Sequence, residues 1–112
     1  MSEPFRLLKP FPDLVTIFST RADGDMKLRD MKEENVARRK SFFTSRGIPV
    51  DSVIGVAAAH GADVIRVGRR EAGAVMKHVD GLITTEPGVF LTVTAADCLV
   101  LYLYDPENKE VA

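Results

Sequence analysis

Two junctions in this 112-residue sequence combine residue types that can bind a metal ion or act in catalysis. His60-Gly61 follows an apolar run and precedes a run of β-type residues. Ala95-Ala96-Asp97-Cys98 lies between two further apolar runs. A side chain at the end of a strand is held by a rigid scaffold and still lies at the rim, where a ligand can approach. We therefore select His60, Asp97 and Cys98 as candidate site residues.

These residue types permit two kinds of chemistry. Imidazole nitrogen and thiolate sulfur both bind zinc, and a catalytic zinc ion normally has three protein ligands and a water molecule. His60 and Cys98 supply two of the three. His78 could supply the third, a residue after Ala112 could supply it, or the chain binds no metal. In the second kind of chemistry, His60 lowers the pKa of the Cys98 thiol and makes it a nucleophile, with Asp97 beside it, as in Cys–His hydrolases.

Ordinary structural roles also fit the individual residues. A free cysteine is most often a small buried side chain, and a loop histidine such as His60 or His78 is often solvated. Arg21 ends an apolar run, where it is either a solvated charge or a ligand for an anion. The polar residues of the predicted helix are expected on its solvated face; they are Asn35, Arg38, Arg39 and Lys40.

The N-terminal half predicts one strand and one helix. Residues 14–20 are rich in β-branched and aromatic types and predict a strand. Asp30 lies three residues before Glu33, which is the spacing of a capping box, and Gly47 supplies a stop signal. A helix is therefore predicted over residues 31–46.

The C-terminal half predicts mostly strands. Several runs are apolar at consecutive positions, as expected for strands that are buried on both faces of a sheet. Turn signals separate them, for example Asp80-Gly81 and Pro87-Gly88, and these turns need no functional explanation. We predict an α/β (α+β) fold with a layered mixed β-sheet and at least one packed helix. The predicted strands cover residues 53–56, 63–67, 82–84, 89–94 and 99–104.

The last residues of the sequence, 109–112, predict the beginning of one more strand after a turn at 105–108. A strand that starts where the sequence stops leaves backbone donors and acceptors unpaired. We therefore expect a truncated part of a larger single domain. Its open strand edge would allow a second copy to bind and form a homo-oligomer.

Composition and charge exclude several classes of function. The chain is 46% hydrophobic and 28% charged, which is typical of a globular domain. Its formal net charge of −1 provides no electrostatic reason to bind nucleic acid or an anionic membrane. The N-terminus lacks the pattern of a signal peptide, and the longest apolar run, 99–104, is far below the roughly 20 residues of a transmembrane helix. With its single cysteine, the sequence predicts a cytoplasmic protein without nucleic-acid or membrane partners.

The order of the motifs resembles the N-terminal part of the laccase-domain family. That family was first described as multicopper polyphenol oxidoreductases and is associated with purine nucleoside phosphorylase and adenosine deaminase activity. The resemblance covers nearly the whole chain, and the order of the pieces is more specific than any one of them. The pieces are Ser19-Thr20-Arg21, Asn35 in a helix, His60-Gly61 with Val64 and Val67, Asp80-Gly81-Leu82-Ile83-Thr84, Pro87-Gly88-Val89, Ala96-Asp97-Cys98 and a strand that ends at Asp105.

The resemblance implies that residues 1–112 are the N-terminal part of a laccase-like purine nucleoside phosphorylase domain. It also implies that His60 and Cys98 are two ligands of a zinc ion. In the family the third ligand is the His of a His-Ala-Gly-Trp-Arg-Gly segment, which follows the position equivalent to Ala112. Asp97 would then orient the site or help proton transfer, and Arg21 could bind phosphate.

The expected function is that of a fragment of a zinc enzyme that acts on purine nucleosides, by phosphorolysis with phosphate or by deamination. The 112-residue chain alone is expected to be inactive. A copper-dependent polyphenol oxidoreductase ranks lower, because multicopper oxidation needs many histidine ligands and the chain has two. A Cys–His hydrolase-like enzyme and a non-enzymatic fold module also stay open.

Overall fold

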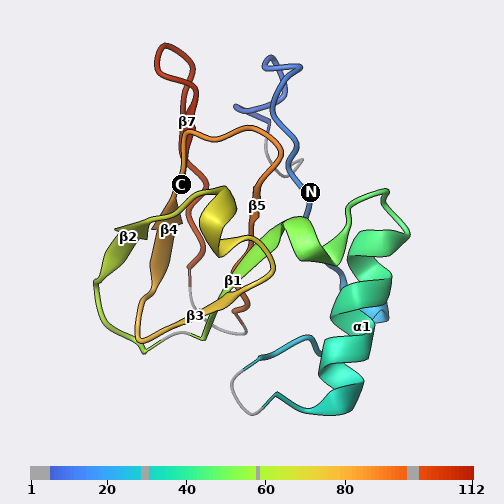
Figure 1. Ribbon diagram of the computed structural model, residues 1–112. Helices are drawn as coiled ribbons and strands as arrows, with labels where there is room; N and C mark the ends of the chain where they lie inside the picture. The colour runs from blue at the N-terminus through green and yellow to red at the C-terminus, as the bar shows by residue number, and fades with distance from the viewer. Residues whose placement is uncertain (1–5, 29–30, 58, 96–98) are drawn as a thin grey trace.

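The computed structural model describes residues 6–28, 31–57, 59–95 and 99–112 (Figure 1). Its central strand, β1 (Val53–Ala57), pairs in parallel with β3 (Val75–Lys77) on one side and with β5 (Phe90–Leu91) on the other. A second parallel pair consists of β2 (Val64–Arg66) and β4 (Gly81–Ile83). The predicted mixed α/β architecture is confirmed.

The described chain has one α-helix and several short elements besides these strands. The helix, α1, spans Glu33–Thr44. Near the C-terminus β6 (Tyr104–Asp105) and β7 (Glu110–Val111) form an antiparallel hairpin. The short 3₁₀ helices are η1 (Arg21–Asp23), η2 (Val50–Ser52) and η3 (Arg69–Glu71).

Strand β1 lies at the centre because both of its faces are apolar. Val53 and Ile54 are fully buried. Adjacent residues of a strand point to opposite faces, so Val53 packs with Phe42 and Phe43 of α1, whereas Ile54 packs with a cluster that includes Leu82 of β4. The layers therefore follow in the order α1, the β1 sheet and the β2–β4 pair (Figure 1).

Helix α1 confirms the predicted helix with shorter ends. It begins at Glu33, and its N-cap residue Lys32 makes no side-chain capping bond. The predicted capping box pairs Asp30 with Glu33, and Asp30 lies outside the described residues, so this box stays a prediction. The stop signal acts as predicted: Gly47 adopts φ +75°, and Ile48 N–H donates to the Phe43 carbonyl oxygen at 2.9 Å.

The inward face of α1 corrects the prediction for two of its polar residues. Asn35 and Arg39 are buried, while Arg38 and Lys40 are exposed as predicted. Asn35 is satisfied, because its Nδ2 donates to the Lys27 carbonyl oxygen at 3.1 Å and its Oδ1 accepts from Arg38 Nη1 at 3.0 Å. For Arg39 Nη2 no hydrogen-bond partner is found among the described residues.

Two of the predicted strands are wrong. Residues 14–20 have no regular structure. Of residues 99–104 only Tyr104 belongs to a strand, and Leu99, Leu101 and Leu103 are exposed instead of central in a sheet. β-Type residues form a strand only where a neighbouring strand supplies hydrogen bonds.

The other strand predictions are confirmed or shortened, and one strand was missed. The strands at 53–56, 63–67 and 82–84 are confirmed as β1, β2 and β4, and that at 89–94 shrinks to Phe90–Leu91. The strand expected in 109–112 is β7. Strand β3 was missed, because no strand was predicted between residues 67 and 82.

The C-terminal hairpin is joined to the N-terminal segment through Asp13. Its Oδ2 accepts hydrogen bonds from Lys109 Nζ at 2.8 Å and from Tyr104 OH at 3.3 Å. The hydrogen bond from Lys109 is the main reason why the pKa of Asp13 lies below its ordinary value of 3.8. The rings of Phe11 and Tyr104 also meet edge to face, with centroids 5.1 Å apart.

We expect this junction to weaken only in strong acid. A carboxyl group whose pKa is lowered by folding stabilises the fold above its ordinary pKa, and this contribution is lost as the pH falls through the lowered value. The ¹³C shift of the Asp13 carboxyl should therefore titrate below pH 3.8, together with a change at Lys109. In Asp13→Asn the acid transition at Lys109 should disappear. Titration of Asp13 at or above its ordinary value would contradict the ion pair.

No helix in the described part of the chain is both long and apolar enough to cross a membrane.

Candidate active site

His60 lies in the loop that follows the carboxyl end of β1. Strand β1 ends at Ala57, and its parallel neighbour β3 ends at Lys77, directly before His78. The third parallel strand, β5, ends at Leu91. Carboxyl ends of parallel strands share one edge of a sheet, and ligands of open α/β sheets bind at that edge. The loops that follow these three strands therefore leave the sheet at the same edge.

The carboxylate of Asp80 is the main contact of the His60 loop. Asp80 Oδ1 accepts the N–H groups of Ala59 at 3.0 Å and of His60 at 2.8 Å, and Oδ2 accepts the N–H of Gly61 at 2.9 Å. Three successive backbone donors thus converge on one half-buried side chain from the start of β4. The Asp80-Gly81 turn separates two strands as predicted, here β3 and β4, and in addition the Asp80 carboxylate organises a second loop.

Both histidines adopt a backbone conformation that is uncommon outside glycine. His60 has φ +57° and His78 has φ +64°. A non-glycine residue in this left-handed region is strained, and such residues concentrate at functional sites. For His60 the compensating contacts are the Asp80 hydrogen bonds, while its side chain lies at the exposed rim.

The other predicted site residues are placed as follows. Asp97 and Cys98 lie outside the described residues, so the expected proximity of His60 and Cys98 stays a prediction. Arg21 is exposed and begins η1, which lies beside α1 and apart from the His60 loop (Figure 1). Its anion-binding role also stays a prediction.

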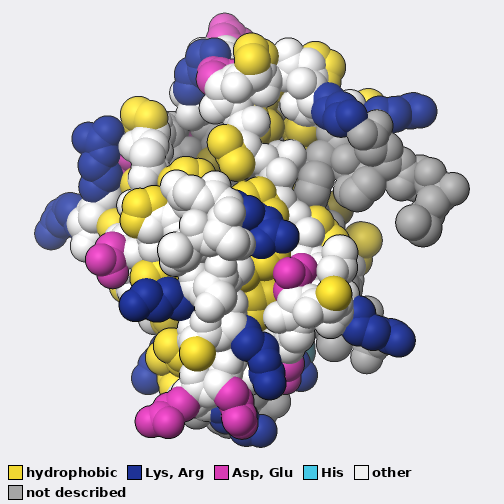
Figure 2. Space-filling model, turned by 90° about the vertical axis from the view of Figure 1, so that its right-hand side faces the viewer, with side chains coloured by type: hydrophobic (Ala, Val, Ile, Leu, Met, Phe, Trp, Pro, Cys, Tyr) yellow, Lys and Arg dark blue, Asp and Glu magenta, His cyan; other side chains and the backbone are white. Residues whose placement is uncertain are grey.

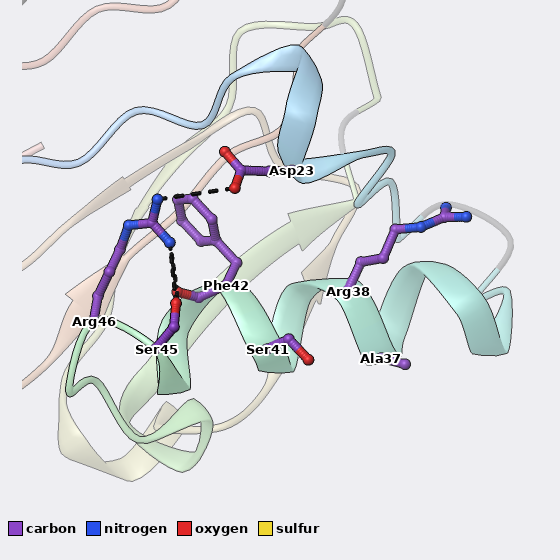
Figure 3. A pocket seen from close by; sticks show the side chains of 7 residues that line it. All are labelled: Asp23, Ala37, Arg38, Ser41, Phe42, Ser45 and Arg46. Atoms are coloured by element: carbon purple, nitrogen blue, oxygen red, sulfur yellow. Dashed lines mark hydrogen bonds and ion pairs between the residues drawn. The ribbon is translucent and has the colours of Figure 1, made fainter.

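A shallow hollow of about 410 Å³ lies between η1 and α1 (Figure 3). The Arg46 guanidinium covers the Phe42 ring at 3.8 Å from its centroid and lies 3.9 Å from Asp23 Oδ1. Arg38 extends away from Arg46 and bonds to Asn35 and to the Asp25 carbonyl oxygen. The two arginines of the hollow are thus engaged within the chain.

On the face shown in Figure 2, basic and acidic side chains are interspersed around exposed hydrophobic groups.

The side-chain types of His60 and Cys98 fit a zinc ion. Zinc takes imidazole nitrogen and thiolate sulfur, and His60 and Cys98 carry those groups. Within the described ranges, His, Cys, Asp and Glu side chains form no group of three that could hold a metal ion. Cys98, the second ligand that the sequence predicts, lies outside the described residues.

The sequence model of a protein family described as "Multi-copper polyphenol oxidoreductase laccase" matches residues 18–112. The chain belongs to this family. The resemblance inferred from the motifs is thereby confirmed, and the match includes His60, Asp80 and Cys98.

Three curated relatives of this laccase family member carry the name purine nucleoside phosphorylase. YlmD of Geobacillus stearothermophilus is 26% identical over 115 residues, which cover 87% of this chain and 42% of the relative. YlmD of Bacillus subtilis is 46% identical over 44 residues, covering 39% and 16%. SCO2081 of Streptomyces coelicolor is 34% identical over 76 residues, covering 68% and 31%. The chain spans less than half the length of each of these relatives.

Sequence reasoning missed the structural roles of three residues of this family member. Asp80 was assigned to a turn, and Asn35 and Arg39 were assigned to solvent. No local signal indicated this role of Asp80, because its hydrogen bonds reach 19 to 21 residues back along the chain. No local signal distinguishes the buried Arg39 from the exposed Arg38 beside it.

Proposed function

We propose that this chain is the N-terminal, metal-binding part of a purine nucleoside phosphorylase of the laccase family. The comparisons support the reaction class through the names of the relatives. The observation that carries the proposal for this chain is the placement of His60, which lies at the carboxyl edge of the sheet in a loop tied down by three hydrogen bonds. The proposed N-terminal part comprises residues 1–112. Its proposed zinc ligands are His60 and Cys98.

The proposed reaction is phosphorolysis. An oxygen of phosphate forms a bond to the anomeric carbon of the ribose while the bond from that carbon to the purine nitrogen breaks. The electron pair leaves with the purine, which takes up a proton, so the products are ribose 1-phosphate and the free base. A zinc ion, when bound, supplies electrophilic stabilisation of negative charge.

The residues of this chain would contribute binding and proton transfer. His60 would hold the metal from a fixed backbone position. Asp97, beside Cys98 in the sequence, would orient the site or hold a proton during departure of the base. Arg21 remains a candidate for the phosphate, although in this chain it lies beside α1 and apart from the His60 loop.

Zinc titration of the 112-residue chain tests the proposed ligands. We expect added zinc to shift the NMR signals of the His60 ring and to slow alkylation of the Cys98 thiol. Binding should be weak, because two protein ligands leave the coordination shell incomplete. His60→Asn and Cys98→Ser should each abolish the response, whereas His78→Asn should retain it. Unchanged zinc binding by His60→Asn would overturn the assignment of His60.

Activity and metal preference are checked in the same preparations. The 112-residue chain should not convert inosine or adenosine with phosphate, and chelation should barely change its melting temperature. Turnover above roughly 1 per second would show that these residues suffice for catalysis. Phosphate-independent release of ammonia would favour deamination, and copper-dependent oxidation of a phenol would favour a polyphenol oxidoreductase.

A further inference from the structure

The Asp80 carboxylate holds the main chain on both sides of the His60 Cα atom. The N–H groups of Ala59 and His60 precede that atom, and the N–H of Gly61 follows it. The N–H groups of His60 and Gly61 belong to the two peptide units that flank the His60 Cα atom. Fixing these two peptide units determines the direction in which the His60 side chain leaves the backbone. The carboxylate accepts these hydrogen bonds with both of its oxygens.

Asp80 is itself fixed by the sheet. Its own N–H and that of Gly81 donate to the Asp63 carbonyl oxygen at 2.9 and 3.2 Å, at the point where β2 and β4 begin to pair. Its neighbour Val79 is buried in the core cluster that also contains Leu82. The carboxylate is therefore presented from a rigid position, and the segment that it holds in place is the His60 loop.

The backbone of His60 needs such support. At φ +57° a histidine is strained, and the conformation persists only where surrounding contacts impose it. Charge-assisted hydrogen bonds from three N–H groups to one carboxylate are among the stronger contacts available to a loop. Without them the loop would sample conformations in which the imidazole points elsewhere.

We propose that Asp80 is a positioning residue for the metal ligand His60, acting through the backbone N–H groups of residues 59–61. This inference rests on the proposed function, because it takes His60 as a ligand of the metal. A ligand that is already oriented loses less conformational freedom when the ion binds, so the affinity is higher. Asp80 does not touch the metal in this role.

The test compares Asp80→Ala and Asp80→Asn with the matched control Asp63→Asn in the 112-residue chain. Asp63 lies in the same turn region and is exposed, and it holds Asp80 through its main-chain carbonyl. Removal of its carboxylate therefore changes the charge near the loop but leaves the Asp80 hydrogen bonds in place. The readouts are amide hydrogen exchange at residues 59–61 without metal, and zinc affinity from the His60 ring signals.

In Asp80→Ala we expect faster exchange of all three amides and a zinc dissociation constant about tenfold higher. Asn at position 80 keeps one acceptor oxygen and places an NH₂ group where the other oxygen was. Asp80→Asn should therefore expose mainly the Gly61 amide and weaken zinc binding less, and it remains informative if the alanine variant does not fold. Asp63→Asn should stay within twofold of the unsubstituted chain.

Two outcomes would overturn the inference. Zinc affinity that is unchanged in Asp80→Ala, despite faster exchange of the loop amides, would show that the loop contact does not position the ligand. Equal losses in Asp63→Asn and Asp80→Ala would show that charge, and not loop geometry, is responsible. If His60→Asn binds zinc normally, the proposed function fails instead, while the exchange data still report whether Asp80 holds the loop.

Discussion

The Arg39→Met variant is expected to unfold at a temperature about 5 °C or more above that of the unsubstituted chain. Arg39 is only 8% exposed, and its Nη2 has no hydrogen-bond partner among the described residues. Burial lowers the pKa of its guanidinium, because the charged form has lost hydration. An unsatisfied buried donor costs about 1–3 kcal/mol, and about 1 kcal/mol corresponds to about 4–8 °C in a domain of this size.

Methionine suits this comparison because it keeps an unbranched stem beside the Phe43 ring, which the guanidinium approaches to 5.5 Å from the centroid. Lys40→Met is the control, since Lys40 lies next in the same helix and is exposed. Its melting temperature should change little. A lower melting temperature for Arg39→Met would show that the guanidinium has an anionic partner, and thermal stabilisation by phosphate in the unsubstituted chain alone would identify one.

Self-association through residues 99–103 is the second large effect that we expect. Leu99, Leu101 and Leu103 are 86%, 68% and 61% exposed and occupy alternate positions of this segment. The three exposed side chains lie within five residues and together offer apolar surface to a partner. Contiguous exposed apolar patches mark protein interfaces, and a second copy carries the same patch.

Leu101→Asp should weaken this association by tenfold or more. Burial of one leucine side chain contributes about 1.5–3 kcal/mol, and about 1.4 kcal/mol changes an equilibrium constant tenfold. Sedimentation velocity over a concentration series measures the effect. Val36→Asp introduces the same charge on the exposed side of α1 and should leave association unchanged. A strictly monomeric unsubstituted chain at the highest concentration would contradict the interface.

Strand prediction succeeded where burial was the deciding factor. The consecutive apolar residues of 53–56 indicate a strand covered on both faces, and β1 has two parallel neighbours and two core clusters against it. The equally apolar run at 99–104 gave the wrong result. Hydrophobicity indicates that a segment seeks burial, but the hydrogen-bonding neighbour that makes it a strand comes from elsewhere in the chain.

The helix shows the same difference between local signals, which the sequence contains, and burial, which depends on tertiary contacts. Its position followed from local signals such as Gly47, whose positive φ ends the helix region. The residues of its inward face could not be predicted from local signals, because two of the four buried positions, Asn35 and Arg39, are polar. Polar side chains on a helix predict solvent contact unless the partners that bury them are known, and the Lys27 carbonyl bound by Asn35 lies eight residues away.

The sequence by itself determined the family, the α/β class and the candidate ligands His60 and Cys98, because residue types and motif order are properties of the chain alone. Only the tertiary structure revealed that Asp80 reaches 20 residues back to His60 and that both histidines occupy the left-handed region. A carboxylate finds its donors through the packing of strands that are distant in sequence. The backbone angles of a loop likewise depend on the contacts that the completed sheet imposes on it.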